Sequence, residues 1–127
     1  MGERRRGRPY PLMRRGEICL VDLAPAMGSE ADKRRPAVIV SNDGANATAT
    51  RLRRGVVTVV PVTSNVERVY PFQVLLEADV TGLVHDSKAQ AEQVRSVAVE
   101  RIGRSVGFVP ATVMTQLDQA LRLHLAL

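Results

Sequence analysis

Apolar residues in this chain gather into short runs that are typical of β-strands. Four runs rich in β-branched and aliphatic residues predict strands at Glu17–Leu23, Ala37–Ser41, Val56–Val62 and Pro71–Leu76. Pro61 interrupts the third run and favours an edge strand or a bulge there, because proline cannot donate a ladder hydrogen bond. Ser87–Val97 fits either a helix or strands, and the alternation around Arg95 leads us to interpret it as two short strands.

One segment near the C-terminus has the periodicity of a helix. Ala111–Leu125 predicts a helix that begins just after Pro110, a residue well suited to a first helical turn. One face of this helix carries Val113, Leu117, Ala120, Leu121 and His124. We therefore interpret His124 as a packing or interface residue rather than a metal ligand.

The remaining segments are predicted to connect these elements. Turn or loop structure is expected at Asn42–Gly44, along the polar stretch that follows to Gly55, at Ala78–His85 and at Glu100–Val106. A mainly β chain with a single C-terminal helix predicts a small, partly open barrel.

Charge is distributed unevenly along the chain. Residues 1–12 hold four Arg and one Glu, so most of the net charge of +5 lies in this segment. It has no apolar periodicity, and we expect a disordered basic tail, either a phosphate-attracting arm or simply a solvated end. Residues 13–127 then form one domain, which agrees with a total length of 127 residues.

Several functional classes are disfavoured by composition. No apolar run approaches the roughly 20 residues of a membrane span, and no signal peptide is recognisable, so we expect a cytoplasmic protein without a membrane partner. Cys19 is the only cysteine, and His85 and His124 lie far apart, so no metal-ligand spacing exists. A P-loop is absent, and two Tyr and two Phe are too few for a base-stacking platform. We expect no cofactor and no metal.

Basic and hydroxyl side chains at two predicted strand ends suggest phosphate binding. Basic residues cluster at Lys33, Arg34, Arg35, Arg51, Arg53 and Arg54. Such runs are often only solvated loop features, but Arg35 abuts Pro36 and a buried strand, which should fix the direction of its guanidinium fork. Thr63 and Ser64 end another strand. A guanidinium and a hydroxyl pair can together bind a phosphate.

The order of motifs resembles the MazF/PemK family of toxins. RGEICLVDLAPAMGSEADKRRPAVIVSNDGAN, from Arg15 to Asn46, is similar to the opening of that family. VVPVTSN resembles its third-strand motif, and Lys88–Val97 resembles its later Glu-Gln motif. The resemblance covers residues 13–127. It implies an SH3-like barrel that forms a homodimer, a sequence-selective and metal-independent endoribonuclease, and a cognate antitoxin protein as partner. The RNA would be single-stranded messenger RNA, with transfer and ribosomal RNA as further candidates.

Matching by position assigns roles to individual residues. The resemblance implies that Arg35 and Thr63 are catalytic. The predicted RNA-binding residues are Glu30, Lys33, Arg34, Arg53, Ser64 and Gln93. Cys19 departs from the pattern, because relatives often carry an aromatic residue there, so we do not expect base stacking at this position.

The chemistry implied by the resemblance needs no protein nucleophile. The 2′-OH of RNA attacks the adjacent phosphorus, which gives a 2′,3′-cyclic phosphate and a 5′-hydroxyl, while Arg35 and Thr63 stabilise the charge. The residue that removes the 2′-OH proton stays open, with Glu30 either a base or only a solvated carboxylate. The alternative function is a non-catalytic toxin or binding module on the same barrel, similar to CcdB-type proteins that target gyrase.

Overall fold

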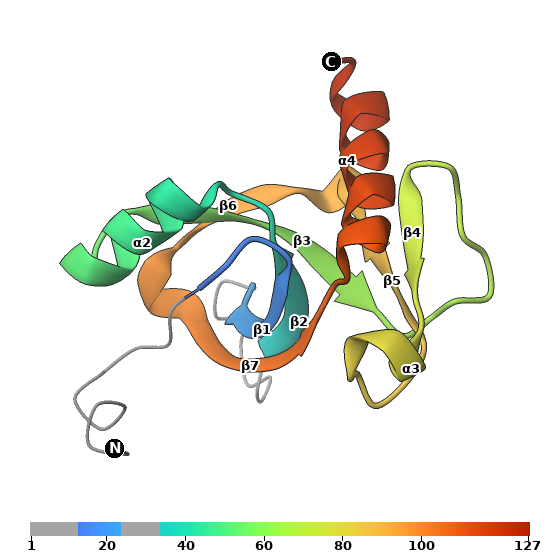
Figure 1. Cartoon of the computed structure of the whole chain (residues 1–127), viewed down its shortest axis with the longest axis horizontal. Helices are drawn as coiled ribbons and strands as arrows, with labels where there is room; N and C mark the ends of the chain where they lie inside the picture. The colour runs from blue at the N-terminus through green and yellow to red at the C-terminus, as the bar shows by residue number, and fades with distance from the viewer. Residues whose placement is uncertain (1–12, 24–33) are drawn as a thin grey trace, which may run out of the picture.

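The computed structural model describes residues 13–23 and 34–127 of the chain (Figure 1). The strands are β1 (Glu17–Asp22), β2 (Arg34–Ile39), β3 (Val56–Thr63), β4 (Gln73–Leu76), β5 (Ser87–Gln90), β6 (Arg95–Ala98) and β7 (Ile102–Phe108). The helices are α2 (Asp43–Leu52), α3 (Ala78–Thr81) and α4 (Ala111–Leu125), with 3₁₀ turns η1 (Ala91–Gln93) and η2 (Val99–Arg101). The predicted tail, residues 1–12, lies outside the described residues and stays a prediction.

Antiparallel pairing curls most of the sheet into a small barrel. β1 pairs with β2 and β7, and β2 pairs with β3. The first half of β3 pairs with β6, which runs through η2 into β7 and brings the sheet round on itself (Figure 1). The last residues of β3 pair instead with β5, and β5 pairs with β4. The predicted barrel with a C-terminal helix is confirmed.

Two hydrophobic clusters occupy the two faces of this curled sheet, as strand alternation requires. One cluster joins Ile18, Val38 and Val60 to the buried side of α4, where Met114 and Leu117 lie. The other cluster, on the opposite face, is built around the following buried residues: Cys19, Val21, Ala37, Ile39, Val57 and Val59. Because both faces are buried, these strands read as nearly continuous apolar runs in the sequence.

α4 matches the predicted helix at both ends, and its N-cap is Pro110. Its last turn extends beyond the core, so His124 is exposed rather than packed. Of the two interpretations of His124, packing within its own chain is therefore wrong, and an interface residue stays a prediction. No helix in the described part of the chain is long and apolar enough to cross a membrane.

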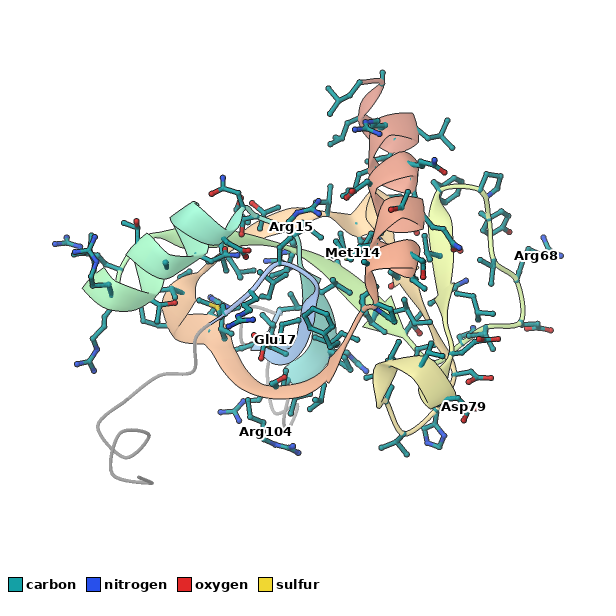
Figure 2. All side chains as sticks on the ribbon, in the orientation of Figure 1. Arg15, Glu17, Arg68, Asp79, Arg104 and Met114 are labelled. Carbon is teal, nitrogen blue, oxygen red and sulfur yellow. The ribbon has the colours of Figure 1, made fainter. Side chains whose placement is uncertain are left out.

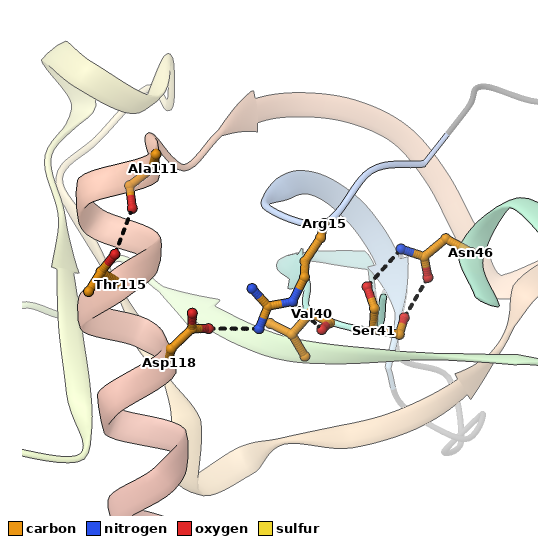
Figure 3. Close-up of polar contacts among 7 residues, drawn as sticks. All are labelled: Arg15, Val40, Ser41, Asn46, Ala111, Thr115 and Asp118. Carbon is orange, nitrogen blue, oxygen red and sulfur yellow. Dashed lines mark hydrogen bonds and ion pairs between the residues drawn. The ribbon is translucent and has the colours of Figure 1, made fainter. Parts of the chain in front are cut away.

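The expected polar loop before β3 is instead a helix, α2. Asn42 caps it by accepting from the Ala45 backbone N–H, so the predicted turn signal is a helix N-cap. Asn46 is buried and exchanges hydrogen bonds with Ser41, whose hydroxyl and carbonyl both contact its amide (Figure 3). The buried side of α2 carries alanine and asparagine instead of leucine. The sequence therefore shows no stripe of large apolar residues that would have predicted a helix.

The expected connection at Glu100–Val106 is also wrong, because most of it belongs to β7. Gly103 and Gly107 hide the strand pattern, and both lie where the barrel is crowded. A Cβ on Gly103 would lie 3.0 Å from the Leu20 carbonyl oxygen, and one on Gly107 would lie 2.6 Å from the Thr81 carbonyl oxygen. These glycines therefore permit close backbone approach within the strand.

The other strand predictions are confirmed, with shifts of a few residues at their ends. Ser87–Val97 does divide into two strands, β5 and β6, separated by η1. Pro61, however, does not mark an edge strand. It lies inside β3, which pairs with β2, β5 and β6, at the point where β3 leaves β2.

Candidate active site

A cleft of about 960 Å³ opens where the ends of several strands meet. Its polar lining consists of Arg35, Thr63, Ser64, His85, Ser87, Gln90, Gln93, Arg95 and Arg104. Its apolar lining consists of Leu20, Leu23, Pro36, Pro61, Val62, Leu83, Val84 and Val106. The cleft thus joins β1, β2, the end of β3, the α3–β5 loop, η1, β6 and β7, and no local segment could form it alone.

Neighbouring strands bring Arg35 and Thr63 to the same cleft. The ladder between β2 and β3 ends at Ala37 opposite Pro61. Arg35 and Thr63 lie two residues beyond this last pair, one on each strand. A guanidinium and a hydroxyl therefore line the same cleft.

The polar groups of this pair are available to a substrate. Within the described part of the chain, the Arg35 side chain has no hydrogen bond or ion pair. The Thr63 hydroxyl oxygen accepts a hydrogen bond from the Asn65 backbone N–H at 3.2 Å. Because that contact uses a lone pair, the hydroxyl proton remains free to donate. Arg35 and Thr63 can therefore both donate to phosphate oxygens.

Two of the predicted RNA-binding residues also line the cleft, Ser64 and Gln93. Gln93 is the last residue of η1, and its neighbour Glu92 anchors this turn to the rest of the fold. The Gln73 amide donates to Glu92 at 2.8 Å and accepts from the Tyr70 backbone N–H at 3.1 Å. This chain of contacts ties Gln93 to the loop that follows Ser64.

Of the remaining predicted RNA-binding residues, the two that the structure describes, Arg34 and Arg53, do not line the cleft. Glu30 and Lys33 lie outside the described residues. Arg34 is exposed at the start of β2, next to Arg35, but is not part of the cleft lining. Arg53 caps the C-terminal end of α2, beside the start of β3. A straight eight-residue strand would separate it from Thr63 by roughly 23 Å.

Five polar residues of the cleft were not among the predicted site residues: His85, Ser87, Gln90, Arg95 and Arg104. Arg95 is held by a hydrogen bond of 2.7 Å from its Nη1 to the Leu23 carbonyl oxygen. Arg104 lies on β7, the strand that was mistaken for a connection, and is labelled in Figure 2. Its isolated place between Gly103 and Ser105 gave no signal. His85 could have been considered only as a loop histidine beside Asp86.

Cys19 lies in the core and not in the cleft. It is 0% exposed, and burial together with the nearby Glu17 carboxylate raises the pKa of its thiol to about 12. The residue cannot stack on a base, as expected from its departure from the family pattern. Among the described residues, no three His, Cys, Asp or Glu side chains come together as a possible metal site.

Comparisons with known proteins identify the family of this domain. Residues 14–125 match the family described as "PemK-like, MazF-like toxin of type II toxin-antitoxin system". Among characterised proteins, the chain is 68% identical to "Endoribonuclease MazF9" of Mycobacterium tuberculosis over 116 residues, which covers 91% of this chain and 98% of that protein. It is 32% identical to "Endoribonuclease MazF" of Staphylococcus epidermidis, with 91% and 93% covered.

Solved structures show the same fold. The crystal structure of MazE-MazF (Form-II) from Deinococcus radiodurans superposes with a TM-score of 0.74 at 26% identity, covering 93% of this chain and 99% of that chain. The Mycobacterium tuberculosis toxin MazF-mt6 superposes with a TM-score of 0.68 at 24% identity, covering 87% and 97%. With the matched sequence spanning the whole barrel and α4, the chain belongs to the PemK-like, MazF-like family of type II toxins.

Proposed function

We propose that this protein is a toxin endoribonuclease that cleaves single-stranded RNA without a metal ion. The observation that carries the proposal is that Arg35 and Thr63, from two neighbouring strands, line the same cleft. The curated relatives named as endoribonucleases support the same activity. Messenger RNA is the proposed main substrate, and the lining residues of the cleft would give the enzyme its sequence selectivity.

The cleft suits a reaction in which the RNA supplies its own nucleophile. The 2′-OH attacks the adjacent phosphorus, a 2′,3′-cyclic phosphate forms, and the 5′-oxygen of the next nucleotide leaves. Negative charge grows on the equatorial phosphate oxygens, where the Arg35 fork and the Thr63 hydroxyl can donate. Arg95 and Arg104 line the same cleft and would bind flanking phosphates. The mechanism requires a 2′-OH, so DNA should be inert.

A second chain and an inhibitor are part of the proposal. The last turn of α4 exposes Leu123 by 59% and Leu125 by 48%, which offers apolar surface for a homodimer. One solved relative is an endoribonuclease "in complex with its cognate antitoxin", and the cationic cleft would suit an acidic antitoxin segment. The proposal places the toxin and its antitoxin in the cytoplasm, where messenger RNA is found.

The test is cleavage of a long transcript in EDTA, with the 5′ ends mapped and their chemistry determined. We expect 5′-hydroxyl ends at recurrent sequences. Arg35→Ala and Thr63→Ala should each lose at least about 100-fold in rate. Arg53→Ala is the matched control, because it removes an arginine that lies outside the cleft, and Thr63→Ser keeps the hydroxyl.

The site assignment would fail if folded Arg35→Ala and Thr63→Ala proteins kept full activity. Intact RNA together with gyrase-dependent DNA breaks would instead support the CcdB-like alternative. Cleavage that stops in EDTA and returns with magnesium would contradict the metal-independent mechanism.

A further inference from the structure

We propose that His85 is the general base that takes the proton from the 2′-OH. This proposal rests on the proposed ribonuclease activity and names the one proton acceptor that the mechanism lacks. It is carried by the position of His85 in the cleft and by the chemistry of the other lining residues.

His85 lines the same cleft as Arg35 and Thr63, although it comes from a separate part of the fold. Its loop joins α3 to β5, and the side chain is exposed to the solvent that fills the cleft. A base must reach the hydroxyl that attacks phosphorus, so it must share a cavity with the groups that bind the phosphate. The α3–β5 loop meets this requirement.

The backbone around His85 is held on both sides. The Ser87 hydroxyl donates to the His85 carbonyl oxygen at 2.9 Å. The Asp86 carboxylate accepts from the Ala78 backbone N–H at 2.8 Å, which fixes the loop against α3. Gly82, with φ of +86°, turns the chain out of α3 and into this loop. A loop with these contacts can present an imidazole in a defined direction.

The other described residues of the cleft cannot serve as a base near neutral pH. They comprise arginines, glutamines, hydroxyl residues and apolar side chains, and no carboxylate lines this part of the cleft. Arginine holds its proton at all accessible pH values, and hydroxyl groups are far too weakly basic. Histidine is the side chain that exchanges a proton between pH 5 and 8. His85 is therefore the acceptor that the described cleft offers.

Charged groups of both signs surround this position. Three arginines face the cleft from other elements: Arg35 on β2, Arg95 on β6 and Arg104 on β7. The carboxylates of the segment that carries His85 are Glu77, Asp79 and Asp86. A bound phosphodiester would neutralise part of the arginine charge.

Proton transfer to His85 accompanies attack of the 2′-oxygen on phosphorus. The 2′-O–H bond breaks and the proton moves to an imidazole nitrogen of His85. The 2′-oxygen forms a bond to phosphorus as the bond to the 5′-oxygen breaks. The leaving oxygen takes a proton from water while Arg35 and Thr63 donate to the phosphate oxygens, and the imidazolium then returns its proton to solvent.

The experiment measures single-turnover cleavage of an oligonucleotide that contains a mapped cleavage site, from pH 5 to 9. The wild-type rate should rise with pH, because a general base must be unprotonated to accept the 2′-OH proton. His85→Gln should lose about 100-fold or more at neutral pH together with this rise. Gln116→Ala is the control, because it removes an exposed polar side chain in the middle of α4 that does not line the cleft.

Two further measurements separate a base from a structural or binding residue. Affinity for the same oligonucleotide with a 2′-deoxy sugar at the cleavage site should change less than about two-fold in His85→Gln. Replacing the leaving 5′-oxygen by sulfur should leave the His85→Gln defect in place, because a thiolate leaves without a proton and only a general-acid defect would be relieved. Free imidazole should partly restore His85→Gly.

The results for His85→Gln show whether His85 is the base, a phosphate-binding residue or neither. Wild-type activity and pH dependence in His85→Gln would overturn the proposal, as would relief of its defect by the sulfur substrate. A defect seen only as weaker binding would make His85 a phosphate-binding residue. If Glu30→Gln removed the pH dependence while His85→Gln kept it, Glu30 would be the base. Failure of the wild-type protein to cleave any RNA would overturn the proposed function as well.

Discussion

Arg15 joins the barrel to the C-terminal helix, and its removal should loosen that contact. Its Nε donates to the Val40 carbonyl oxygen and its Nη2 to the Asp118 carboxylate of α4, each at 2.7 Å (Figure 3). The backbone N–H of Arg15 also donates to Asp43, but this bond does not depend on the side chain. The test substitution is Arg15→Met, which keeps most of the aliphatic stem.

The expected loss can be estimated contact by contact. A hydrogen bond from a charged donor to a partly buried carbonyl contributes about 1.5 kcal/mol, at the low end of the range because solvent is near. The ion pair is about one-third exposed on each side, with 33% and 35% of the side chains accessible, so it contributes roughly 0.5–1 kcal/mol. Arg15→Met should therefore lower the free energy of unfolding by about 2 kcal/mol.

Urea unfolding at fixed protein concentration measures this change, and a double-mutant cycle with Asp118→Ala isolates the ion pair. The coupling energy should be about 0.5–1 kcal/mol. Arg14→Met is the control, because that residue is exposed and its side chain makes no hydrogen bond within the described part of the chain. A coupling energy of zero, or an equal loss in Arg14→Met, would refute the role assigned to Arg15.

Three further substitutions test contacts inside the fold. The raised pKa of about 12 keeps the Cys19 thiol neutral in the folded state, whereas the thiol of the unfolded chain ionises at lower pH. In urea titrations, the stability advantage of wild type over Cys19→Ala should therefore shrink as pH rises from about 9 towards 12. An advantage that stays constant over this pH range would contradict the prediction. Gly107→Ala should lose about 1–3 kcal/mol in thermal unfolding, because its Cβ would meet the Thr81 carbonyl oxygen at 2.6 Å, and a neutral effect would show that the strands can separate there. Glu92→Ala should lose about 1–2 kcal/mol in urea unfolding by leaving the Gln73 amide without its acceptor, whereas Glu92→Gln, which keeps an acceptor oxygen, should lose less than half of that.

The parts of the fold that sequence reading predicted well are those whose signal is local. β1, β3 and α4 carry runs of apolar residues with the period of their own element. α2 and β7 were not predicted from the sequence, because many of their side chains are small or polar. The stability of α2 comes from the Asn42 cap and from the buried amide of Asn46, and these contacts depend on Ser41 and on the sheet beneath.

The residues of the candidate site also fall into two groups, those with a local sequence signal and those that only the fold brings together. Arg35 and Thr63 were predicted because each lies at a strand end within a recognisable motif, and both line the cleft. Arg104 and His85 were not, because the elements that carry them meet the cleft only when β7 closes the barrel and α3 turns the chain towards β5. Arg53 was included on charge density alone, although the fold places it at the opposite end of β3.

Pro36 explains why the pairing of β2 with β3 ends beside the cleft. Continued pairing beyond Ala37 and Pro61 would next bring Pro36 opposite Val62. The Val40 backbone N–H donates to the β3 backbone, so every second residue of β2, including Pro36, faces β3. Proline has no N–H to donate there, so β2 cannot extend the ladder at this position.

Arg35 and Thr63 lie two residues past the last pair of β2 with β3, and both line the cleft. The Arg-Pro sequence in β2 therefore has a physical reason beyond resemblance to a family. Pro36 ends the pairing of β2 with β3, so that Arg35 lines the cleft instead of continuing the ladder with β3.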